Sequence, residues 1–142
     1  LLLNLLNMDN LENTNIDYFN KLIIPCDLKA QFFSNKSIIN LVQKTRKDIS
    51  NIIKGHDKRQ LFIVGPCSIH NIEDAKEYGL KLKKLADAVS DKILIVMRVY
   101  FEKPRTTIGW KGLINDPDLN ETYDVNKGLK LARELLLFLN NI

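Results

Sequence analysis

A cluster of cationic and hydroxyl side chains follows an apolar run in the second half of the chain. After ILIVM (93–97), the segment 98–111 places four cations against one acidic side chain, with two threonines among them. The cations are Arg98, Lys103, Arg105 and Lys111, and the hydroxyls belong to Thr106 and Thr107. Guanidinium groups hold phosphate or carboxylate through paired hydrogen bonds, and lysine adds a compact charge. The segment favours an anionic ligand: a phosphorylated metabolite first, then a structural ion-pair loop, and nucleic acid last.

The second candidate group is Cys67, which follows Gly65 and Pro66 at the end of the apolar run LFIV (61–64). A thiolate there would ligate a divalent metal or attack an electrophile. A small, buried, apolar cysteine is an equally open interpretation. His70 could share a metal with Cys67 in a tight turn, but a surface histidine or a helix-entry residue is favoured.

The elements around these groups predict an α/β fold. Apolar residues at helical spacing predict an amphipathic helix from 37 to 53, and the runs 61–64 and 93–97 predict strands buried on both faces. Asn71 should cap one further helix, and Asp124 or Asn126 the next. Strands joined by a helix are parallel, so the segments after both strands should meet at one edge of the sheet.

Two parallel strands do not make a stable sheet alone, so the chain is interpreted as the opening of a larger α/β domain, doubly wound or an eightfold barrel. Residues 1–35 are rich in Asn and have no clean period, which predicts an N-terminal arm or short helix that lies on another surface. Pro25 should break this arm. The start without Met and the stop at NNI favour a fragment.

Composition excludes several classes of protein. The chain has 142 residues, 45% hydrophobic and 27% charged, as in soluble globular proteins. Its 21 basic and 17 acidic residues are spread along the chain, which does not favour nucleic acid. No apolar run approaches the roughly 18 residues of a membrane span, and LLLNLL lacks the features of a signal peptide. The two cysteines lack zinc-finger or redox-pair spacing, and we expect a reducing cytoplasm.

Three stretches resemble class I 3-deoxy-D-arabino-heptulosonate 7-phosphate (DAHP) synthase: LFIVGPCSIH (61–70), IVMRVYFEKPRTTIGWKGLINDP (95–117) and GLKLARELLL (128–137). The likeness runs from Lys54 to the end of the chain, and the first 35 residues resemble the family's arm loosely. The resemblance implies an N-terminal arm and helix, followed by the first two βα units of a TIM (β/α)8 barrel that is incomplete here. Residues 36–142 would form this part of the barrel domain.

The resemblance also implies an activity. Such a transferase condenses phosphoenolpyruvate with D-erythrose 4-phosphate and water to give DAHP and phosphate, the first step of the shikimate pathway to chorismate and the aromatic amino acids. It requires a divalent metal of the Mn, Fe, Co or Zn type. It further implies a homo-oligomer, dimer or tetramer, with an aromatic amino acid as feedback inhibitor and with neither nucleic acid nor membrane as partner.

Individual residues take roles from the same resemblance. It implies that Cys67 is a metal ligand and that Lys103 is the catalytic lysine, near the reacting carbon of phosphoenolpyruvate. Arg98 and Lys103 would bind phosphoenolpyruvate, while Arg105 and Thr106 would bind erythrose 4-phosphate.

The remaining metal ligands would lie outside this chain, because neither His56 nor His70 occupies the place of the family's ligand histidine. Residues 1–142 alone are therefore expected to be inactive. The alternative from another class is a small anion-binding or RNA-binding α/β module that is complete at this length.

Overall fold

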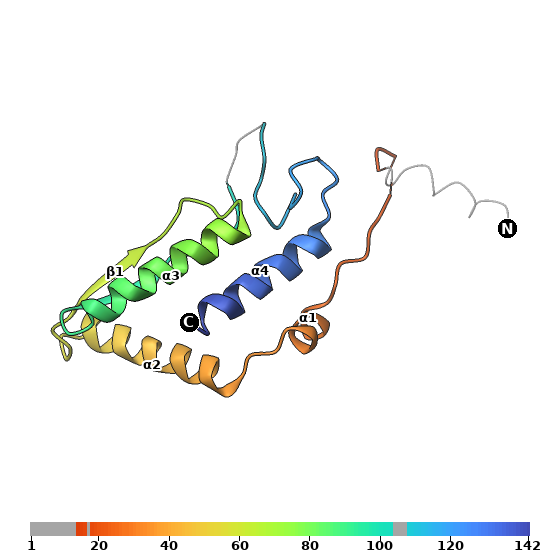
Figure 1. Ribbon diagram of the computed structural model, residues 1–142. Coiled ribbons are helices and arrows are strands. Elements are labelled where there is room, and N and C mark those ends of the chain that lie inside the picture. Colours follow the sequence, from red (N-terminus) through yellow and green to blue (C-terminus); the bar gives the residue numbers. More distant parts are fainter. Residues whose placement is uncertain (1–13, 17, 104–107) are drawn as a thin grey trace, which may run out of the picture.

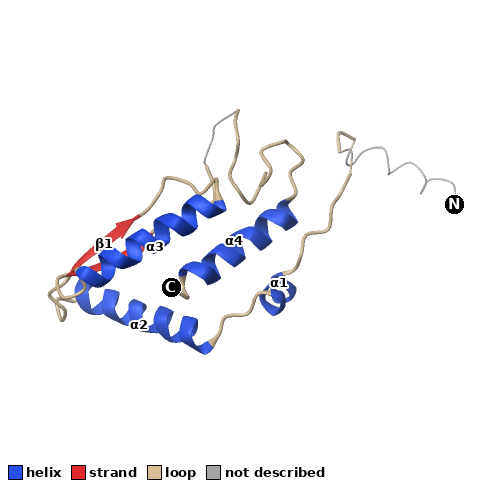
Figure 2. Ribbon diagram, in the orientation of Figure 1, coloured by secondary structure: helices blue, strands red, loops and turns tan. Residues whose placement is uncertain are grey.

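The computed structural model describes residues 14–16, 18–103 and 108–142. Within them, the elements follow the order helix, helix, strand, helix, strand, helix (Figures 1 and 2). They are α1 (Pro25–Gln31), α2 (Lys36–Ile53), β1 (Gln60–Val64), α3 (Ile72–Ala88), β2 (Ile93–Met97) and α4 (Val125–Leu139). Each predicted helix and strand is confirmed, with boundaries that differ by about one residue from those expected. None of the described helices is long and apolar enough to cross a bilayer.

The two strands form a parallel sheet, as predicted. Gln60 pairs with Ile93 at one end, and Val64 pairs with Met97 at the other. The α3 crossover joins the strands, so both run in the same direction and end at the same edge. The segments after β1 and β2 consequently emerge together, at the end of the molecule where α4 begins (Figure 1).

Side chains at the helix starts explain where the long helices begin. The Asn35 side chain accepts a hydrogen bond from Ile38 N at 2.9 Å and caps α2. Asn71 caps α3 by accepting from two backbone N–H groups, and Asp124 caps α4 by accepting from Lys127 N at 3.0 Å. Caps of this kind contribute about 1 kcal/mol each. Of the two candidates for the α4 cap, Asp124 is therefore confirmed.

The core lies between α3, α4 and the loops that follow the strands. Helices α3 and α4 pack side by side, and α3 also packs on β2 (Figure 1). The buried cluster comprises Ile69, Ala75, Phe101, Leu113, Ala132 and Leu135. Leu135 is fully buried. Because half of this cluster comes from loop residues, the same contacts that stabilise the helix pair also fix the loops.

Burial of β1 differs from the prediction. The residues of β2 are all partly buried, but Phe62 and Ile63 of β1 are 45% and 63% exposed. The expectation that this strand is buried on both faces is wrong for the described residues. Successive side chains of a strand point to opposite faces, so the exposure of Phe62 and Ile63 means that neither face of β1 is fully covered by the described residues.

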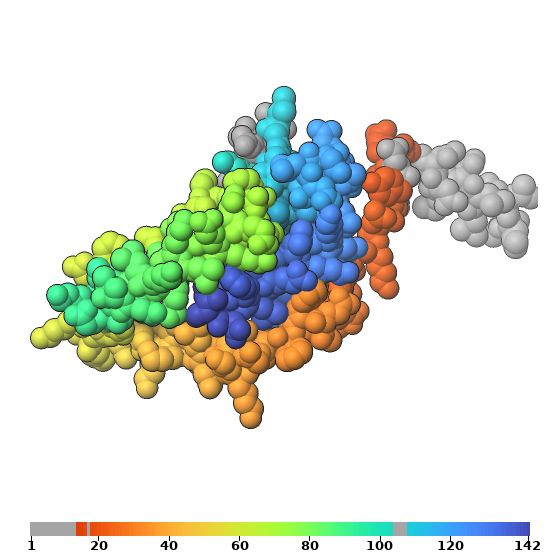
Figure 3. Space-filling model, viewed as in Figure 1, coloured from red at the N-terminus to blue at the C-terminus, as the bar shows by residue number. Residues whose placement is uncertain are grey.

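The arm before α2 lies on α4. The Asn126 side chain donates to the Lys21 carbonyl at 3.0 Å and accepts from Ile23 N at 2.8 Å. Arg133 donates to the Phe32 carbonyl at 3.0 Å and to the hydroxyl of Ser34 at 3.1 Å. Figure 3 shows this part of the arm against the outside of α4. The expectation that the arm lies on another surface is confirmed for residues 21–34, and that surface belongs to the same chain.

The sequence predicts that Pro25 breaks the arm, but the structure shows no break there. It is the first residue of α1, where its missing N–H would have no intrahelical partner and its fixed φ already suits a helix. The arm therefore contains a short helix, and Pro25 starts it.

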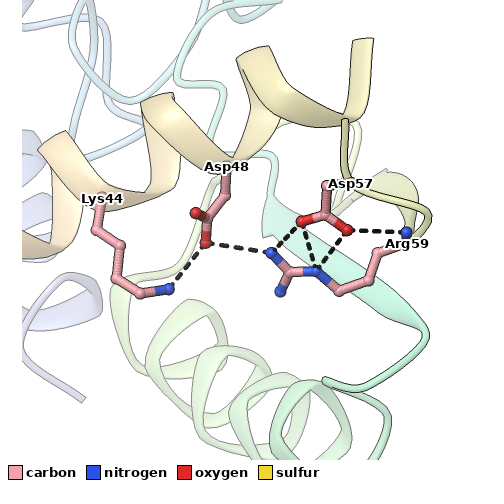
Figure 4. A network of polar contacts seen from close by, with 4 residues as sticks. All are labelled: Lys44, Asp48, Asp57 and Arg59. Atoms are coloured by element: carbon pink, nitrogen blue, oxygen red, sulfur yellow. Dashed lines mark hydrogen bonds and ion pairs between the residues drawn. The ribbon is translucent and has the colours of Figure 1, made fainter. Parts of the chain in front are cut away.

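An ion-pair network joins α2 to the start of β1, at the edge of the sheet opposite the predicted site (Figure 4). Arg59 bonds Asp57 at 2.7 Å and approaches Asp48 at 3.3 Å, while Lys44 bonds Asp48 at 2.8 Å. Hydrogen bonds from Lys44 and Arg59 hold the pKa of Asp48 below its usual value, and hydrogen bonds from Arg59 lower the pKa of Asp57.

This network predicts an acid dependence of stability. Since both folded-state pKa values are lowered, the stabilisation is fully present above the unfolded pKa of about 4 and is lost as the pH falls through the folded values. The double variant Asp48→Asn, Asp57→Asn should therefore lose less stability than the wild type between neutral pH and about pH 3. Denaturant unfolding at a series of pH values measures this. Asp91→Asn, an exposed acid outside the network, is the control; equal acid slopes for the double variant and the wild type would contradict the prediction.

Candidate active site

The segments after the two strands are joined by backbone hydrogen bonds. Arg98 N donates to the Val64 carbonyl at 2.7 Å, and Ile69 N donates to the Tyr100 carbonyl at 2.7 Å. The ladder of the parallel sheet thus continues beyond the strand ends and holds the 65–69 turn beside the start of the basic loop. This is the juxtaposition that the strand order predicts.

Gly65 allows this close approach. A Cβ at this position would overlap the carbonyl oxygen of Arg98 and would lie 3.0 Å from the Arg98 Cβ. A methyl group has no space there, because the opposing atom belongs to a backbone that cannot rotate away. Glycine at position 65 is thus a requirement of the approach between the two segments.

Arg98 ties the Cys67 turn to β2. Its Nη1 donates to the carbonyls of Pro66 at 2.6 Å and of Cys67 at 2.7 Å. The Tyr100 ring lies against the guanidinium, with 4.7 Å between the guanidinium carbon and the ring centroid. The structure therefore brings two predicted site residues, Arg98 and Cys67, into direct contact. The Tyr100 stack was not predicted, although side chains two residues apart on extended backbone point to the same side.

Cys67 is exposed, which contradicts the interpretation that it is a small buried apolar residue. An accessible thiol at the carboxyl edge of the sheet fits one position in the coordination sphere of a divalent metal. The described residues contain no group of three His, Cys, Asp or Glu side chains that could hold a metal together. His70 is also exposed, and no such group includes it. Among the described residues, Cys67 thus has no companion group that completes a metal site, and such a site would need ligands from elsewhere.

The basic loop is anchored on both sides of the undescribed residues. Lys103 N donates to the Lys111 carbonyl at 2.9 Å, and Leu113 N donates to the Phe101 carbonyl at 2.9 Å. Phe101 and Leu113 are both core residues. The Trp110 indole donates to the Asp116 carbonyl at 2.7 Å and packs against the buried core, so it anchors the loop. Lys103 therefore stands on a short antiparallel pair, close in sequence to the strand end.

Two predicted site residues, Arg105 and Thr106, lie outside the described residues, and their assignment to erythrose 4-phosphate stays a prediction. No acidic side chain in the described part of the chain lies within ion-pair distance of Arg98, Lys103 or Lys111. This counts against the structural ion-pair loop that the sequence left open. Positive charge without an internal counter-charge favours an external anion.

Comparison with known proteins decides the family. The model of the DAHP synthetase I family matches residues 30–135, which is most of the chain. The chain belongs to this family. The DAHP synthetase I match begins within α1 and includes both strands, Cys67, Arg98 and the basic loop. The alternative of a small RNA-binding module is accordingly not favoured.

Individual relatives agree with the DAHP synthetase I assignment. The chain is 51% identical over 134 residues to the Tyr-sensitive phospho-2-dehydro-3-deoxyheptonate aldolase of Escherichia coli, covering 94% of this chain and 38% of the relative. It is 47% identical over 131 residues to the tyrosine-inhibited enzyme of the same name from Candida albicans, covering 92% of this chain and 35% of the relative. A solved aldolase structure from Francisella tularensis superposes with a TM-score of 0.86 at 53% identity, over 89% of this chain and 37% of that one. The chain thus spans somewhat more than a third of the length of these family members.

Proposed function

We propose that the chain forms part of an enzyme that condenses phosphoenolpyruvate with D-erythrose 4-phosphate and water, giving DAHP and phosphate. The observation that carries this proposal is the 47% to 51% identity, over more than nine-tenths of the chain, to proteins named phospho-2-dehydro-3-deoxyheptonate aldolase. The contact between Arg98 and the Cys67 turn supports it, since the guanidinium bonds the backbone of the turn that carries the thiol, at the carboxyl ends of the strands.

The cations provide a physical basis for the reaction. Two phosphorylated substrates repel each other, so positive side chains must neutralise both before they can meet. Arg98 and Lys103 would hold phosphoenolpyruvate, with Lys103 near its reacting carbon, while Arg105 and Thr106 would hold the phosphate of erythrose 4-phosphate. Formation of the carbon–carbon bond leaves a cationic centre on the former phosphoenolpyruvate; water adds there, and phosphate departs.

Cys67 would be one ligand of a divalent metal. Thiolate favours a borderline transition metal of the Mn, Fe, Co or Zn type over Mg²⁺, and such a metal supplies Lewis acidity toward an aldehyde oxygen when bound. The role of the chain itself is to hold the thiol in place: the Arg98 guanidinium donates to the carbonyls of Pro66 and Cys67, which lie on either side of the Cys67 Cα that carries the thiol side chain. Because the described residues contain no group of three such side chains that could hold a metal, residues 1–142 alone should be inactive.

The architecture proposed for the whole enzyme is a (β/α)8 barrel. Residues 36–142 would supply its first two βα units and residues 1–35 an N-terminal arm. The likeness to the Francisella tularensis structure supports this arrangement. Since relatives carry the names Tyr-sensitive, Phe-sensitive and Trp-sensitive, we also propose an aromatic amino acid as feedback inhibitor. A homo-oligomer in the cytoplasm, dimeric or tetrameric, completes the proposal.

Comparing Lys103 of the basic loop with an exposed lysine outside the loop tests the function in the full-length enzyme. Lys103→Ala should lower kcat/KM for phosphoenolpyruvate by about 100-fold or more, because it removes a charge held at the reacting centre. Lys58→Ala, an exposed lysine at the opposite end of β1, should leave kcat/KM close to the wild-type value. Consumption of phosphoenolpyruvate with erythrose 4-phosphate and Mn²⁺ is the assay. A wild-type enzyme without this activity would refute the function, and equal effects of the two variants would refute the role of Lys103.

A further inference from the structure

The two edges of the Arg98 guanidinium differ in their contacts. Its Nη1 is committed to the carbonyls of Pro66 and Cys67, at 2.6 and 2.7 Å. An arginine carries five N–H donors, and the other three are on Nε and Nη2. These two nitrogens make no hydrogen bond to the described residues, so that edge of the group is available to an anion. The Arg98 side chain thus contacts the turn that carries Cys67 and also presents free N–H donors to a ligand.

The two hydrogen bonds at Nη1 hold one edge of the guanidinium and leave the opposite edge without a hydrogen bond to the described residues. Since hydrogen bonds tolerate some bending, the group can still tilt while it keeps both bonds, and a tilt displaces the outward edge most. The Tyr100 ring restricts this tilt because it lies on the guanidinium, 4.7 Å from the carbon to the ring centroid. Stacking of a planar cation on an aromatic ring is attractive and orients the cation.

The backbone of Tyr100 is held by the 65–69 turn and by the core. Its carbonyl accepts from Ile69 N at 2.7 Å, in the turn that carries Cys67, and the next residue, Phe101, is buried in the core. The ring therefore projects from a fixed backbone. Direct contacts therefore connect Cys67, Arg98 and Tyr100 into one unit.

We propose that Tyr100 is a positioning residue that fixes the plane of the Arg98 guanidinium, so that anion binding at Arg98 and metal binding at Cys67 reinforce one another. The identity of the anion, phosphoenolpyruvate, rests on the proposed function. The coupling is reciprocal: whatever phosphoenolpyruvate adds to metal affinity, the metal adds to phosphoenolpyruvate affinity. Loss of the ring should weaken phosphoenolpyruvate binding about three- to tenfold, the range expected of a partly exposed cation–π contact.

Binding measurements on the full-length enzyme, without turnover, test the proposal. Tyr100→Leu removes the ring, Tyr100→Phe retains it, and Tyr78→Leu removes an equally exposed tyrosine from α3, since Tyr78 is 39% and Tyr100 38% exposed. Co²⁺ affinity is read from the thiolate-to-Co²⁺ absorption band, with and without phosphoenolpyruvate. Calorimetry gives phosphoenolpyruvate affinity, and circular dichroism verifies the fold of each variant.

We expect Tyr100→Leu to weaken phosphoenolpyruvate binding and to reduce its effect on Co²⁺ affinity, while Tyr100→Phe and Tyr78→Leu behave as the wild type. Wild-type affinity and coupling in Tyr100→Leu would overturn the proposal, as would an equal loss in Tyr100→Phe. A wild-type enzyme that binds no phosphoenolpyruvate would instead refute the proposed function. The stack would then be judged by Co²⁺ affinity alone: weaker binding in Tyr100→Leu supports it, and unchanged binding overturns it.

Discussion

Cys67→Ala in the full-length enzyme should abolish metal-dependent synthesis of DAHP. The thiol is exposed at the carboxyl edge of the sheet, and the described residues gather no group of side chains that could replace it as ligand. Substituting a residue that contacts a metal ligand, and not the metal itself, lowers metal affinity or activity by about 10- to 100-fold. Loss of a direct ligand should therefore lower metal affinity by at least about 100-fold. Activity and bound metal, measured across a range of Mn²⁺ concentrations, give the result.

The second cysteine provides the control. Cys26 is also exposed but lies in α1, away from the carboxyl edge of the sheet. Cys26→Ala should retain both activity and metal content. Full activity of Cys67→Ala at ordinary metal concentrations would rule out Cys67 as a ligand, whatever its position in the fold.

Gly112→Ala should destabilise the protein by roughly 2–5 kcal/mol, the largest effect on stability that we expect of a single added methyl group. Gly112 has a φ of +125°, which side chains rarely adopt, and a Cβ would overlap the Phe101 carbonyl oxygen. That carbonyl accepts from Leu113 N, so it cannot move without breaking the antiparallel pair that carries Lys103. Denaturant unfolding measures the loss, and the affinity for phosphoenolpyruvate should fall in parallel.

Gly55→Ala separates the two causes of destabilisation, which are backbone strain at a positive φ and steric overlap of the added methyl group. Gly55 has a φ of +75°, but no atom lies within 4 Å of an added Cβ. Its substitution should cost about 1 kcal/mol, from backbone strain alone. Equal losses at the two positions would show that crowding against Phe101 contributes nothing and that the basic loop adapts to the extra methyl.

The sequence predicted those parts of the fold that repeat along the chain. Continuous apolar runs located β1 and β2, helical spacing located α2, and the helical crossover determined that the strands are parallel. The strand order then predicted that Cys67 and Arg98 lie together at the carboxyl ends of the two strands. Each of these inferences uses a periodic or topological signal, which a single sequence contains.

Contacts between a side chain and a distant backbone have no such signal. Nothing in the residue types states that Arg98 bonds the carbonyls of Pro66 and Cys67, or that Asn126 holds the arm and does not cap α4. The exposure of Phe62 also escaped prediction, because burial depends on what covers a strand as well as on its apolar residues. The identities of the substrates came from family resemblance, since cations select for negative charge but not for a particular metabolite.

The attachment of the arm to α4 has a consequence for the order of folding. The hydrogen bond between Ile23 and Asn126 joins residues 103 positions apart, and that between Phe32 and Arg133 joins residues 101 apart. Closing so long a loop costs conformational entropy before any contact compensates for it. The surface on which the arm packs exists only after α4 has formed. The arm should therefore join last during folding and detach first during native-state opening, while the helix pair and sheet remain intact.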